Sequence, residues 1–364
     1  MSAPTGVPGR VVHVAAGREW RGGERQVWLL ARELARLGVP QVLVTARDSV
    51  LARRAREAGV DVVEAGWSIG LDPRALLTTI SQTRALPATI HAHDPHALRL
   101  ALLARPAGAP LVATRRVTFA VRAGGTWTRA DRVIAISEAV ARALVAGGVA
   151  RERIAVIPSA VPVAEIARAT PGGWRARLHL PADAPLLVNV AALTPEKGHE
   201  VLLESAARLR ATHPAARWLV AGDGPLRGTL AASARRLGLA DVVRWLGHVD
   251  DVAGLLADAD VVVSASTAEG LGSTLLDAMA LARPIVAAAA GGVPEVLAEG
   301  AGLLVPPGAA DALARAVSRV LAEPELAAAL RAAAGRRAAA FGVERMAERT
   351  VEVYRSVSME TERA

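Results

Sequence analysis

The sequence predicts an α/β protein made of two consecutive domains of the Rossmann type, and three observations lead to this fold class. Short apolar strands alternate with amphipathic helical stretches, which is typical of parallel α/β structure. The alternation runs twice along the chain, with a pause over residues 159–185, which are rich in Pro, Ala and Gly. A length of 364 residues and a hydrophobic fraction of 52% are sufficient for two separate cores.

The first series of the alternation predicts seven strands, with helical stretches between most of them. One such stretch ends at Gly38, and glycine is common just after the last turn of a helix. The expected strands of this series comprise residues 11–16, 41–46, 60–65, 89–94, 110–114, 132–137 and 153–158.

The second series predicts six strands, followed by three helical stretches that close the chain. We place the domains at residues 1–163 and 164–342, with the option that a terminal helix at about 343–358 packs back on the first domain. The expected strands of the second series comprise residues 186–193, 216–224, 242–247, 260–266, 284–289 and 302–307.

The composition excludes several classes of protein and of site. Cysteine is absent, so disulfides, thiolate metal sites and a cysteine nucleophile are excluded. No apolar run approaches the ~18–20 residues that span a bilayer, and the first ten residues lack the pattern of a signal peptide. We therefore expect a cytoplasmic protein, either free or peripheral on the inner face of the cell membrane.

Positive charge is concentrated in the first half of the chain and is carried by arginine. Up to Val163 there are 22 arginines against 12 acidic residues, whereas the rest holds 20 arginines and Lys197 against 23 acidic residues. The basic half either reflects a general arginine bias or favours an anionic partner, such as a phosphorylated acceptor, acidic lipid or nucleic acid. The candidates for contact with an anionic membrane include Leu51, Arg53, Arg54 and Arg56.

The loop and helix after the strand at 260–266 form the first candidate ligand site. Two Rossmann-type domains imply a cleft between them, with ligands bound at the carboxyl ends of strands. The helix begins near Ser273, after two glycines that let backbone N–H groups approach an anion. Glu269 precedes this helix and Asp277 lies just inside it, so both carboxylates could accept hydrogen bonds from sugar hydroxyls.

Lys197 is the only lysine of the chain, and its position indicates a phosphate contact. It lies in LTPEKGHE, which follows the strand at 186–193 and therefore reaches the same edge of the sheet as the Ser273 helix start. An ammonium and a glycine-rich helix start together could hold a diphosphate without a metal ion.

Several segments resemble glycosyltransferase family 4, which comprises retaining nucleotide-sugar enzymes of the GT-B fold. STAEGLGSTLLDAMALARPIVAAAAGGVPE resembles the signature segment of that family, and LTPEKGHEVLLESAARL resembles its phosphate-binding segment. WRGGERQVWLLARELARLG resembles its Gly-Gly loop and first helix. The resemblance extends from about Val11 to Arg319 and implies a GT-B architecture, with two Rossmann-like domains facing across a cleft. The first domain would bind the acceptor and the second the nucleotide sugar.

The resemblance also implies a role for individual residues. Glu269 would contact the hydroxyls of the donor sugar, Lys197 would neutralise the departing diphosphate, and His93 would lie near the transferred sugar. Asp277 would bind the ribose, and the Gly-Gly loop would approach the phosphate from across the cleft. The implied donor-binding set is Gly22, Gly23, Gly270, Leu271, Gly272, Ser273, Thr274 and Asp277, with no metal and no other cofactor.

The chain departs from the family pattern at two positions. Ala192 stands within the segment where the family has an arginine before its lysine, so Lys197 would carry more of the phosphate charge unless Arg25 or Arg227 substitutes. Asp277 stands where the family has the longer glutamate, so a water molecule could bridge it to the ribose.

Three other patterns have plainer explanations. Asp258 and Asp260 form a DxD pattern, but it precedes a strand instead of following one, so Asp258 is expected to end a helix. His91 and His93 lie on one face of a strand, but no third metal ligand is evident, and His91 is expected to be structural. The GDGP segment at 222–225 is expected to be a turn, with contact to the base as an alternative.

The function expected from these features is retaining transfer of a sugar from a nucleotide-diphosphate sugar to a glycan or to a lipid-linked precursor of the cell envelope. Two alternatives stay open, a GT-B nucleotide-sugar epimerase and a basic nucleic-acid-binding protein. The aromatic content of 3% and the absence of a recognisable nucleic-acid-binding motif weigh against the second alternative.

Overall fold

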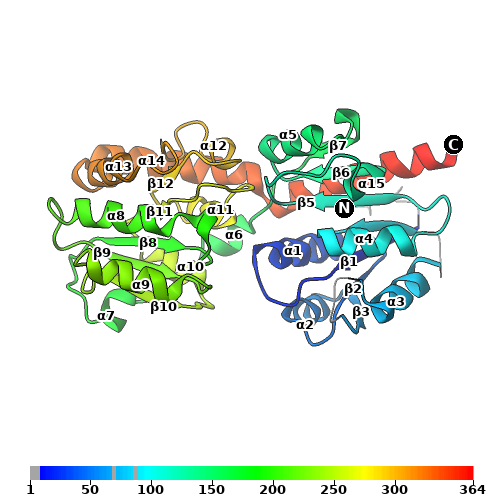
Figure 1. The fold of residues 1–364 in the computed structure, drawn as a ribbon, viewed down its shortest axis with the longest axis horizontal. Coiled ribbons are helices and arrows are strands. Elements are labelled where there is room, and N and C mark those ends of the chain that lie inside the picture. Colours follow the sequence, from blue (N-terminus) through cyan, green and yellow to red (C-terminus); the bar gives the residue numbers. More distant parts are fainter. Residues whose placement is uncertain (1–8, 68–70, 85–87, 364) are drawn as a thin grey trace. The chain divides into compact units, whose positions relative to one another are not determined.

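The computed structural model describes residues 9–67, 71–84 and 88–363, which form two compact units. The first unit comprises the chain up to Ala160 together with Val343–Ala364, and the second comprises Val161–Gly342. Each unit is a parallel β-sheet with helices packed around it (Figure 1). The fold class expected from the alternating pattern is therefore present twice.

The first unit is built on a seven-stranded parallel sheet with the strand order β3-β2-β1-β4-β5-β6-β7. Strands β2 and β5 are buried at every position, because helices shield both faces of a parallel sheet. Each strand lies within a few residues of its expected place. The strands are β1 (Arg10–Ala15), β2 (Gln41–Ala46), β3 (Asp61–Ala65), β4 (Ala88–Ala92), β5 (Leu111–Arg115), β6 (Arg132–Ala135) and β7 (Ile154–Val156).

The last helix of the chain belongs to the first unit. Tyr354 and Ala347 of this helix are fully buried in one core cluster with Leu30 and Leu34 of α1. The chain thus returns to its first unit after it has completed the second. The helices of the first unit are α1 (Gly22–Arg36), α2 (Val50–Glu57), α3 (Pro73–Arg84), α4 (Pro95–Ala104), α5 (Glu138–Ala146) and α15 (Val343–Arg363).

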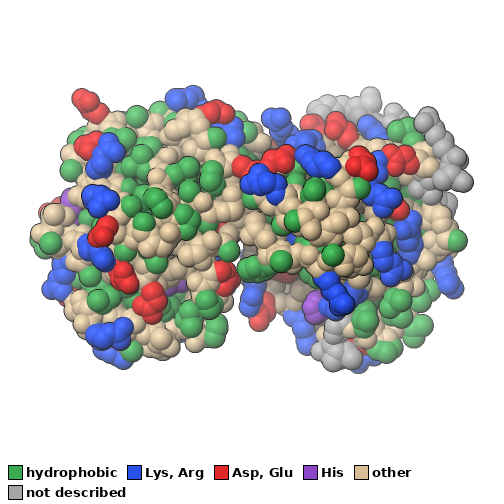
Figure 2. Space-filling view, turned by 45° about the horizontal axis from the view of Figure 1, so that its top comes forward, with side chains coloured by type: hydrophobic (Ala, Val, Ile, Leu, Met, Phe, Trp, Pro, Cys, Tyr) green, Lys and Arg blue, Asp and Glu red, His purple; other side chains and the backbone are tan. Residues whose placement is uncertain are grey.

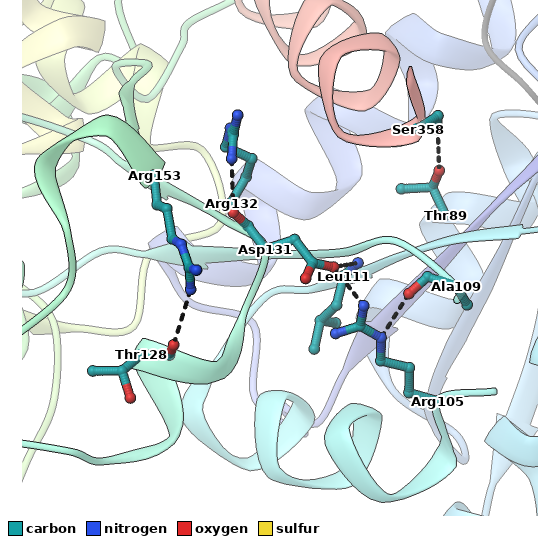
Figure 3. A network of polar contacts seen from close by, with 9 residues as sticks. All are labelled: Thr89, Arg105, Ala109, Leu111, Thr128, Asp131, Arg132, Arg153 and Ser358. Atoms are coloured by element: carbon teal, nitrogen blue, oxygen red, sulfur yellow. Dashed lines mark hydrogen bonds and ion pairs between the residues drawn. The ribbon is translucent and has the colours of Figure 1, made fainter. Parts of the chain in front are cut away.

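A polar network fixes the edge of this unit where β5 begins (Figure 3). Asp131 accepts hydrogen bonds from the Leu111 backbone N–H and from Arg105 Nη2, both at 2.7 Å. The hydroxyls of Thr89 and Ser358 lie 3.5 Å apart and join β4 to α15. Some arginines of the basic half therefore have structural partners and do not contribute free positive charge.

The second unit is built on a six-stranded parallel sheet with the order β10-β9-β8-β11-β12-β13. Its strands are β8 (Leu186–Val190), β9 (Arg217–Ala221), β10 (Val243–Gly247), β11 (Val261–Ser264), β12 (Ile285–Ala288) and β13 (Leu303–Val305). Its helices are α6 (Val163–Ile166), α7 (Trp174–Arg177), α8 (His199–Leu209), α9 (Arg227–Arg236), α10 (Val252–Ala257), α11 (Ser273–Ala280), α12 (Val293–Val296), α13 (Ala310–Ala322) and α14 (Pro324–Ala338).

Both sheets reverse their strand order once, and these reversals locate the candidate sites. In the first unit the reversal lies between β1 and β4, and in the second it lies between β8 and β11. Loops that leave the carboxyl ends of the two central strands diverge at such a switch point and leave a crevice for ligands. The predicted site residues follow these four strands.

The membrane contact expected at α2 is wrong in part. Leu51 is only 1% exposed, so it cannot insert into a lipid surface. The Arg54 guanidinium stacks 4.4 Å from the Trp20 ring, and Arg56 pairs with Glu64 at 2.7 Å. On the face that Figure 2 shows, arginine side chains lie among acidic and apolar ones in both units. None of the helices within the described residues combines the length and apolar character of a membrane-spanning segment.

Candidate active site

The switch point of the second unit brings Lys197 and Glu269 together. The Lys197 ammonium donates to Glu269 Oε2 at 2.6 Å, and the two side chains are 22% and 17% exposed. They come from the loops after β8 and β11, as the sequence pattern predicts. Each was expected to contact a ligand, and the structure shows that they also contact each other.

The backbone around Lys197 has its shape because Gly198 follows it. Gly198 has φ = +67°, and a Cβ at this position would lie 2.1 Å from the Ala265 carbonyl oxygen. Only glycine allows this approach of the loop after β8 to the end of β11. The Thr267 N–H donates to the Glu196 carbonyl at 2.8 Å and joins the same two loops. These backbone contacts therefore hold the loops that carry Lys197 and Glu269 close together.

A glycine pair after β12 fixes the backbone of Glu269 from the other side. The Gly292 N–H donates to the Glu269 carbonyl at 3.1 Å. A Cβ on Gly291 would lie 1.7 Å from the same oxygen, so no side chain fits at this position. Sequence inspection included these glycines in the signature segment without assigning them this role.

The start of α11 offers backbone donors beside the ion pair. Gly272 precedes the helix with φ = +92°, and its carbonyl accepts the Leu275 N–H at 2.9 Å. The N–H groups of Ser273 and Thr274 lie in the first turn, where the helix itself supplies no acceptors and the helix dipole favours an anion. The Thr274 hydroxyl donates to the Val190 carbonyl at 3.3 Å, which joins α11 to the end of β8.

Three other residues of the implied donor set lie deeper in the structure. Gly270 is buried, and Leu271 is 2% exposed with its side chain in the core, so only backbone groups of these residues can serve a ligand. Asp277 lies in the second turn of α11 and is 5% exposed. A contact of Asp277 with a ribose therefore requires a ligand that reaches into this part of the unit, or a bridging water.

Arg227 stands next to the segment that lacks the family arginine. The Gly222 backbone packs so closely on Ala191 that a Cβ would lie 2.0 Å from the Ala191 carbonyl oxygen. The Leu226 N–H donates to the Leu193 carbonyl at 3.1 Å, so the GDGP loop lies against the loop that leads to Lys197. Arg227 follows directly, and its Nη1 is buried without a hydrogen-bond partner among the described residues.

The carboxylates of the DxD pattern have structural roles. Asp258 accepts the Trp174 N–H at 2.9 Å, and Asp260 accepts the Leu186 N–H at 2.8 Å and an ion pair from Arg175 at 2.5 Å. Both acids connect the start of the second unit to its sheet. This agrees with the plain explanation of the pattern.

The switch point of the first unit carries a buried histidine cluster. His13 Nδ1 and His93 Nε2 lie 2.9 Å apart, and His91 contacts the Tyr354 hydroxyl at 2.6 Å and the Thr114 hydroxyl at 2.7 Å. Burial lowers the pKa of His13 to about 4 and lowers the pKa of His91 and His93 well below the usual value. All three rings are therefore neutral at pH 7.

His13 is the third histidine of this cluster, and the sequence pattern did not identify it. It lies on β1, directly opposite His91 in the register of the sheet, and could have been found only from the strand pairing. Nitrogen atoms of His13, His91 and His93 lie within 4.8 Å of one another, which is the spacing of a possible metal site. However, Arg116 Nη2 lies 3.5 Å from His93 Nδ1, and this positive charge opposes a bound cation.

The hydrogen-bond chain also assigns the protons of the cluster. A guanidinium can only donate, so His93 Nδ1, which faces Arg116, is the acceptor. Neutral His93 then carries its proton on Nε2 and donates it to His13 Nδ1. His13 in turn carries its proton on Nε2, and a side-chain hydrogen bond with Gln41 raises the pKa of His13 slightly against the larger effect of burial. Both nitrogens of His93 thus face protein groups.

A pocket of about 180 Å³ opens beside His93 within the first unit. Gly23 and Glu24 at the start of α1 line one side, and Arg115 and Arg116 line another. Glu24 accepts the Arg21 N–H at 3.2 Å, and burial raises the pKa of its carboxyl group. Gly22 is exposed at the first position of the helix. The pocket thus combines a helix start with two guanidinium groups.

Family models match both units. The model for Glycosyl transferases group 1 matches residues 173–337, and the model for Glycosyltransferase Family 4 matches residues 20–165. The two matches divide the chain as the two sheets do.

Curated relatives align with part of the chain. A D-inositol 3-phosphate glycosyltransferase of Kineococcus radiotolerans is 37% identical over 249 residues, which cover 62% of this chain and 57% of the relative. The lipopolysaccharide core biosynthesis glycosyltransferase LpsE of Rhizobium meliloti is 36% identical over 153 residues, or 42% of this chain and 44% of the relative. The chain thus spans about half the length of the curated relatives it matches.

Solved structures share the fold over nearly the whole chain. HepE from Anabaena, in complex with UDP and glucose, superimposes with a TM-score of 0.82 at 21% identity, covering 94% of this chain and 98% of the other. A sucrose-phosphate synthase from Thermosynechococcus elongatus superimposes with a TM-score of 0.78 at 22% identity, covering 96% and 99%. At this identity the likeness shows the fold alone.

Proposed function

Because the chain belongs to the family 4 glycosyltransferases and has their GT-B fold, we propose that it transfers a sugar from a nucleotide-diphosphate sugar with retention of the anomeric configuration. The second unit binds the donor, and the first unit binds the acceptor. No metal ion takes part, since an ammonium and a helix start serve the diphosphate.

The observation that carries this proposal is the 2.6 Å contact between Lys197 and Glu269 at the start of α11. A cation for the departing diphosphate and a carboxylate for sugar hydroxyls thereby stand at one switch point, next to the N–H groups of Ser273 and Thr274. Fixed charges of this kind stabilise a leaving group electrostatically and need no covalent intermediate. Neither an epimerase nor a nucleic-acid-binding function is favoured by a separate observation.

The proposed acceptor is a glycan or a lipid-linked precursor of the cell envelope, and the proposed location is the cytoplasm, with attachment to the inner face of the membrane. The relative LpsE, named for lipopolysaccharide core biosynthesis, supports the choice of acceptor class. The excess of arginine in the first half supports an anionic surface as partner.

A nucleotide-sugar screen followed by product analysis tests the donor and the stereochemistry. Thermal unfolding is measured with UDP, GDP, ADP and dTDP sugars, including UDP-glucose, and the true donor raises the apparent stability by mass action. The product formed with that donor is then examined by NMR, where we expect the anomeric configuration of the donor. The expected result is one stabilising donor and one retained glycoside.

Other outcomes would overturn separate parts of the proposal. An inverted product would contradict retention, and an epimerised sugar without transfer would favour the epimerase. Stabilisation by no nucleotide sugar, together with sequence-independent DNA binding that weakens with salt, would favour the nucleic-acid alternative. Loss of activity after treatment with EDTA, restored by a divalent cation, would contradict a metal-free site.

A further inference from the structure

We propose that the pocket of the first unit binds an anionic group of the acceptor, a phosphate or a carboxylate, through Arg115 and Arg116. This rests on the proposed function, because it names the chemical class of the acceptor for the same transfer. The pocket lies within one unit and holds about 180 Å³, so it fits one small charged group with its immediate neighbours.

Arg115 is a buried cation without a counter-charge. It is 6% exposed, its Nη2 donates to the Phe119 carbonyl at 2.5 Å, and its guanidinium lies 5.1 Å from the Trp127 ring. Its Nε has no hydrogen-bond partner, and no ion pair joins it to a carboxylate within the described part of the chain. A buried charge that lacks a paired partner is costly, which points to a ligand that supplies the missing anion.

Arg116 is in a similar position beside His93. Its Nη1 donates to the His93 carbonyl at 2.6 Å, and its Nε is buried without a hydrogen-bond partner among the described residues. Burial lowers the pKa of Arg116 to about 10, so the guanidinium stays charged at neutral pH. Glu24 and Asp94 act on it through space, but neither forms an ion pair with it within the described residues.

The acids of the pocket accept hydrogen bonds from backbone N–H groups and not from these arginines. Asp94 Oδ1 accepts the N–H groups of His96 and Ala97, and Asp94 Oδ2 accepts the Ala16 N–H at 2.7 Å. The Asp94 carboxylate therefore accepts its hydrogen bonds from the first turn of α4 and from the residue that follows β1. Glu24 accepts a hydrogen bond from the Arg21 N–H, and burial raises the pKa of its carboxyl group, although the charge of Arg116 opposes this shift.

The chemistry of the pocket therefore selects an oxyanion. Guanidinium groups bind phosphate and carboxylate with paired, charge-assisted hydrogen bonds. The start of the 15-residue helix α1, where Gly23 lines the pocket, adds the favourable end of a helix dipole. A neutral sugar hydroxyl would leave Arg115 without a counter-charge and Arg116 with only the through-space effect of Glu24 and Asp94.

Binding of inorganic phosphate tests this inference directly. Isothermal titration is carried out on the full chain carrying Lys197→Ala, so that phosphate at the donor side does not hide the signal. We expect saturable binding that Arg115→Gln weakens at least about tenfold, because it removes one charge-assisted pair. Arg115→Lys keeps the positive charge but loses the paired donors of the guanidinium. We expect its phosphate affinity to lie between that of the protein with Arg115 intact and that of Arg115→Gln.

The matched control is Arg122→Gln, which removes the same charge from an exposed residue seven positions along the chain. It should leave phosphate binding unchanged, which separates a built site from general attraction to a basic surface. Equal weakening by Arg115→Gln and Arg122→Gln, or absence of phosphate binding to a folded protein, would overturn the inference. Circular dichroism shows whether each variant is folded. If Arg115→Gln does not fold, Arg115→Lys takes its place in the comparison with Arg122→Gln.

Kinetics with the intact Lys197 separate this inference from the proposed function. Arg115→Gln should raise KM for a phosphorylated acceptor, while the affinity for the nucleotide sugar stays the same. If Arg115→Gln instead weakens nucleoside-diphosphate binding, the pocket serves the donor and the acceptor assignment is wrong. If no donor binds at all, the proposed function fails independently of the phosphate result.

Discussion

The cations at the two switch points differ in what balances their charge. In the second unit, Lys197 is neutralised by Glu269 at 2.6 Å. In the first unit, Arg115 and Arg116 line a pocket and have no ion pair with any carboxylate that the structure describes. In the second unit a carboxylate of the protein balances the cation, whereas in the first unit we infer that an anionic ligand does so.

This difference indicates how each site would respond to an anion. A diphosphate that binds Lys197 must displace a carboxylate, and the displaced Glu269 is then free to accept hydrogen bonds from the sugar. Recognition of the two halves of the donor would thus be coupled through one ion pair. An anion at Arg115 displaces no charged group, so no ion pair has to be broken before it binds.

The largest effect is expected when the paired cation is removed. Lys197→Ala should lower kcat by about 10²–10³-fold, the usual cost of removing one group that stabilises charge in the transition state. It leaves Glu269 as an unpaired carboxylate where the diphosphate should bind, which adds repulsion. Steady-state kinetics with the true donor measure both kcat and KM.

Lys197→Arg is the matched variant, because it keeps the charge but changes its size and geometry. We expect activity between that of the wild type and of Lys197→Ala. Thermal unfolding of all three proteins shows whether each variant is folded. Wild-type kcat and KM in folded Lys197→Ala would show that the lysine does not serve the diphosphate.

That Lys197 and Glu269 lie at the same edge of one sheet could be predicted from the sequence, whereas their ion pair and the pocket of the first unit could not. Apolar segments and helical periodicity located every strand, and loops after β8 and β11 must meet at one sheet edge. The pairing of β1 with β4, which places His13 opposite His91, is a long-range register that no local pattern encodes. The absence of a counter-charge at Arg115 likewise depends on contacts between distant segments.

The two units also differ in how strongly their stability is expected to depend on pH. The first unit buries His13, His91 and His93, whereas the second has one strongly shifted histidine, His199, whose pKa burial lowers to about 4. Between the ordinary value of 6.5 and the lowered folded value, the unfolded chain binds protons that the folded one does not. Stability is thus complete above pH 6.5 and falls as the pH decreases, by on the order of 2 kcal/mol at pH 5 for each of His13 and His199, whose folded pKa values are about 4.

We therefore expect the first unit to lose more of its free energy of unfolding than the second between pH 7 and pH 5. Hydrogen exchange followed by mass spectrometry in urea assigns each opening to one unit by its peptides. His13→Asn should reduce the pH dependence of the first unit, whereas His96→Gln, which removes an exposed imidazole, should not. Equal acid sensitivity of the two units would contradict this view of the histidine cluster.

The smallest expected effect comes from removing the carboxylate of the Lys197 pair. Glu269→Gln frees the ammonium without changing the shape of the side chain. The nucleoside diphosphate should then bind a few-fold more tightly, because displacing a partly exposed ion pair costs about 0.2–1 kcal/mol. Transfer should become slower in the same variant, since an amide is a weaker acceptor than a carboxylate for the sugar hydroxyls.

Tighter binding of the diphosphate together with slower turnover would indicate that the diphosphate replaces Glu269 as the partner of Lys197. Glu196→Gln is the matched control, because it removes the same charge from the residue next to Lys197, while the Glu196 carboxylate accepts the Thr194 hydroxyl at 2.7 Å instead. Titration calorimetry with UDP, or with the diphosphate that the donor screen identifies, measures the affinity of both variants. If Glu269→Gln weakens binding of the diphosphate, Glu269 orients Lys197 for the ligand and does not compete for it.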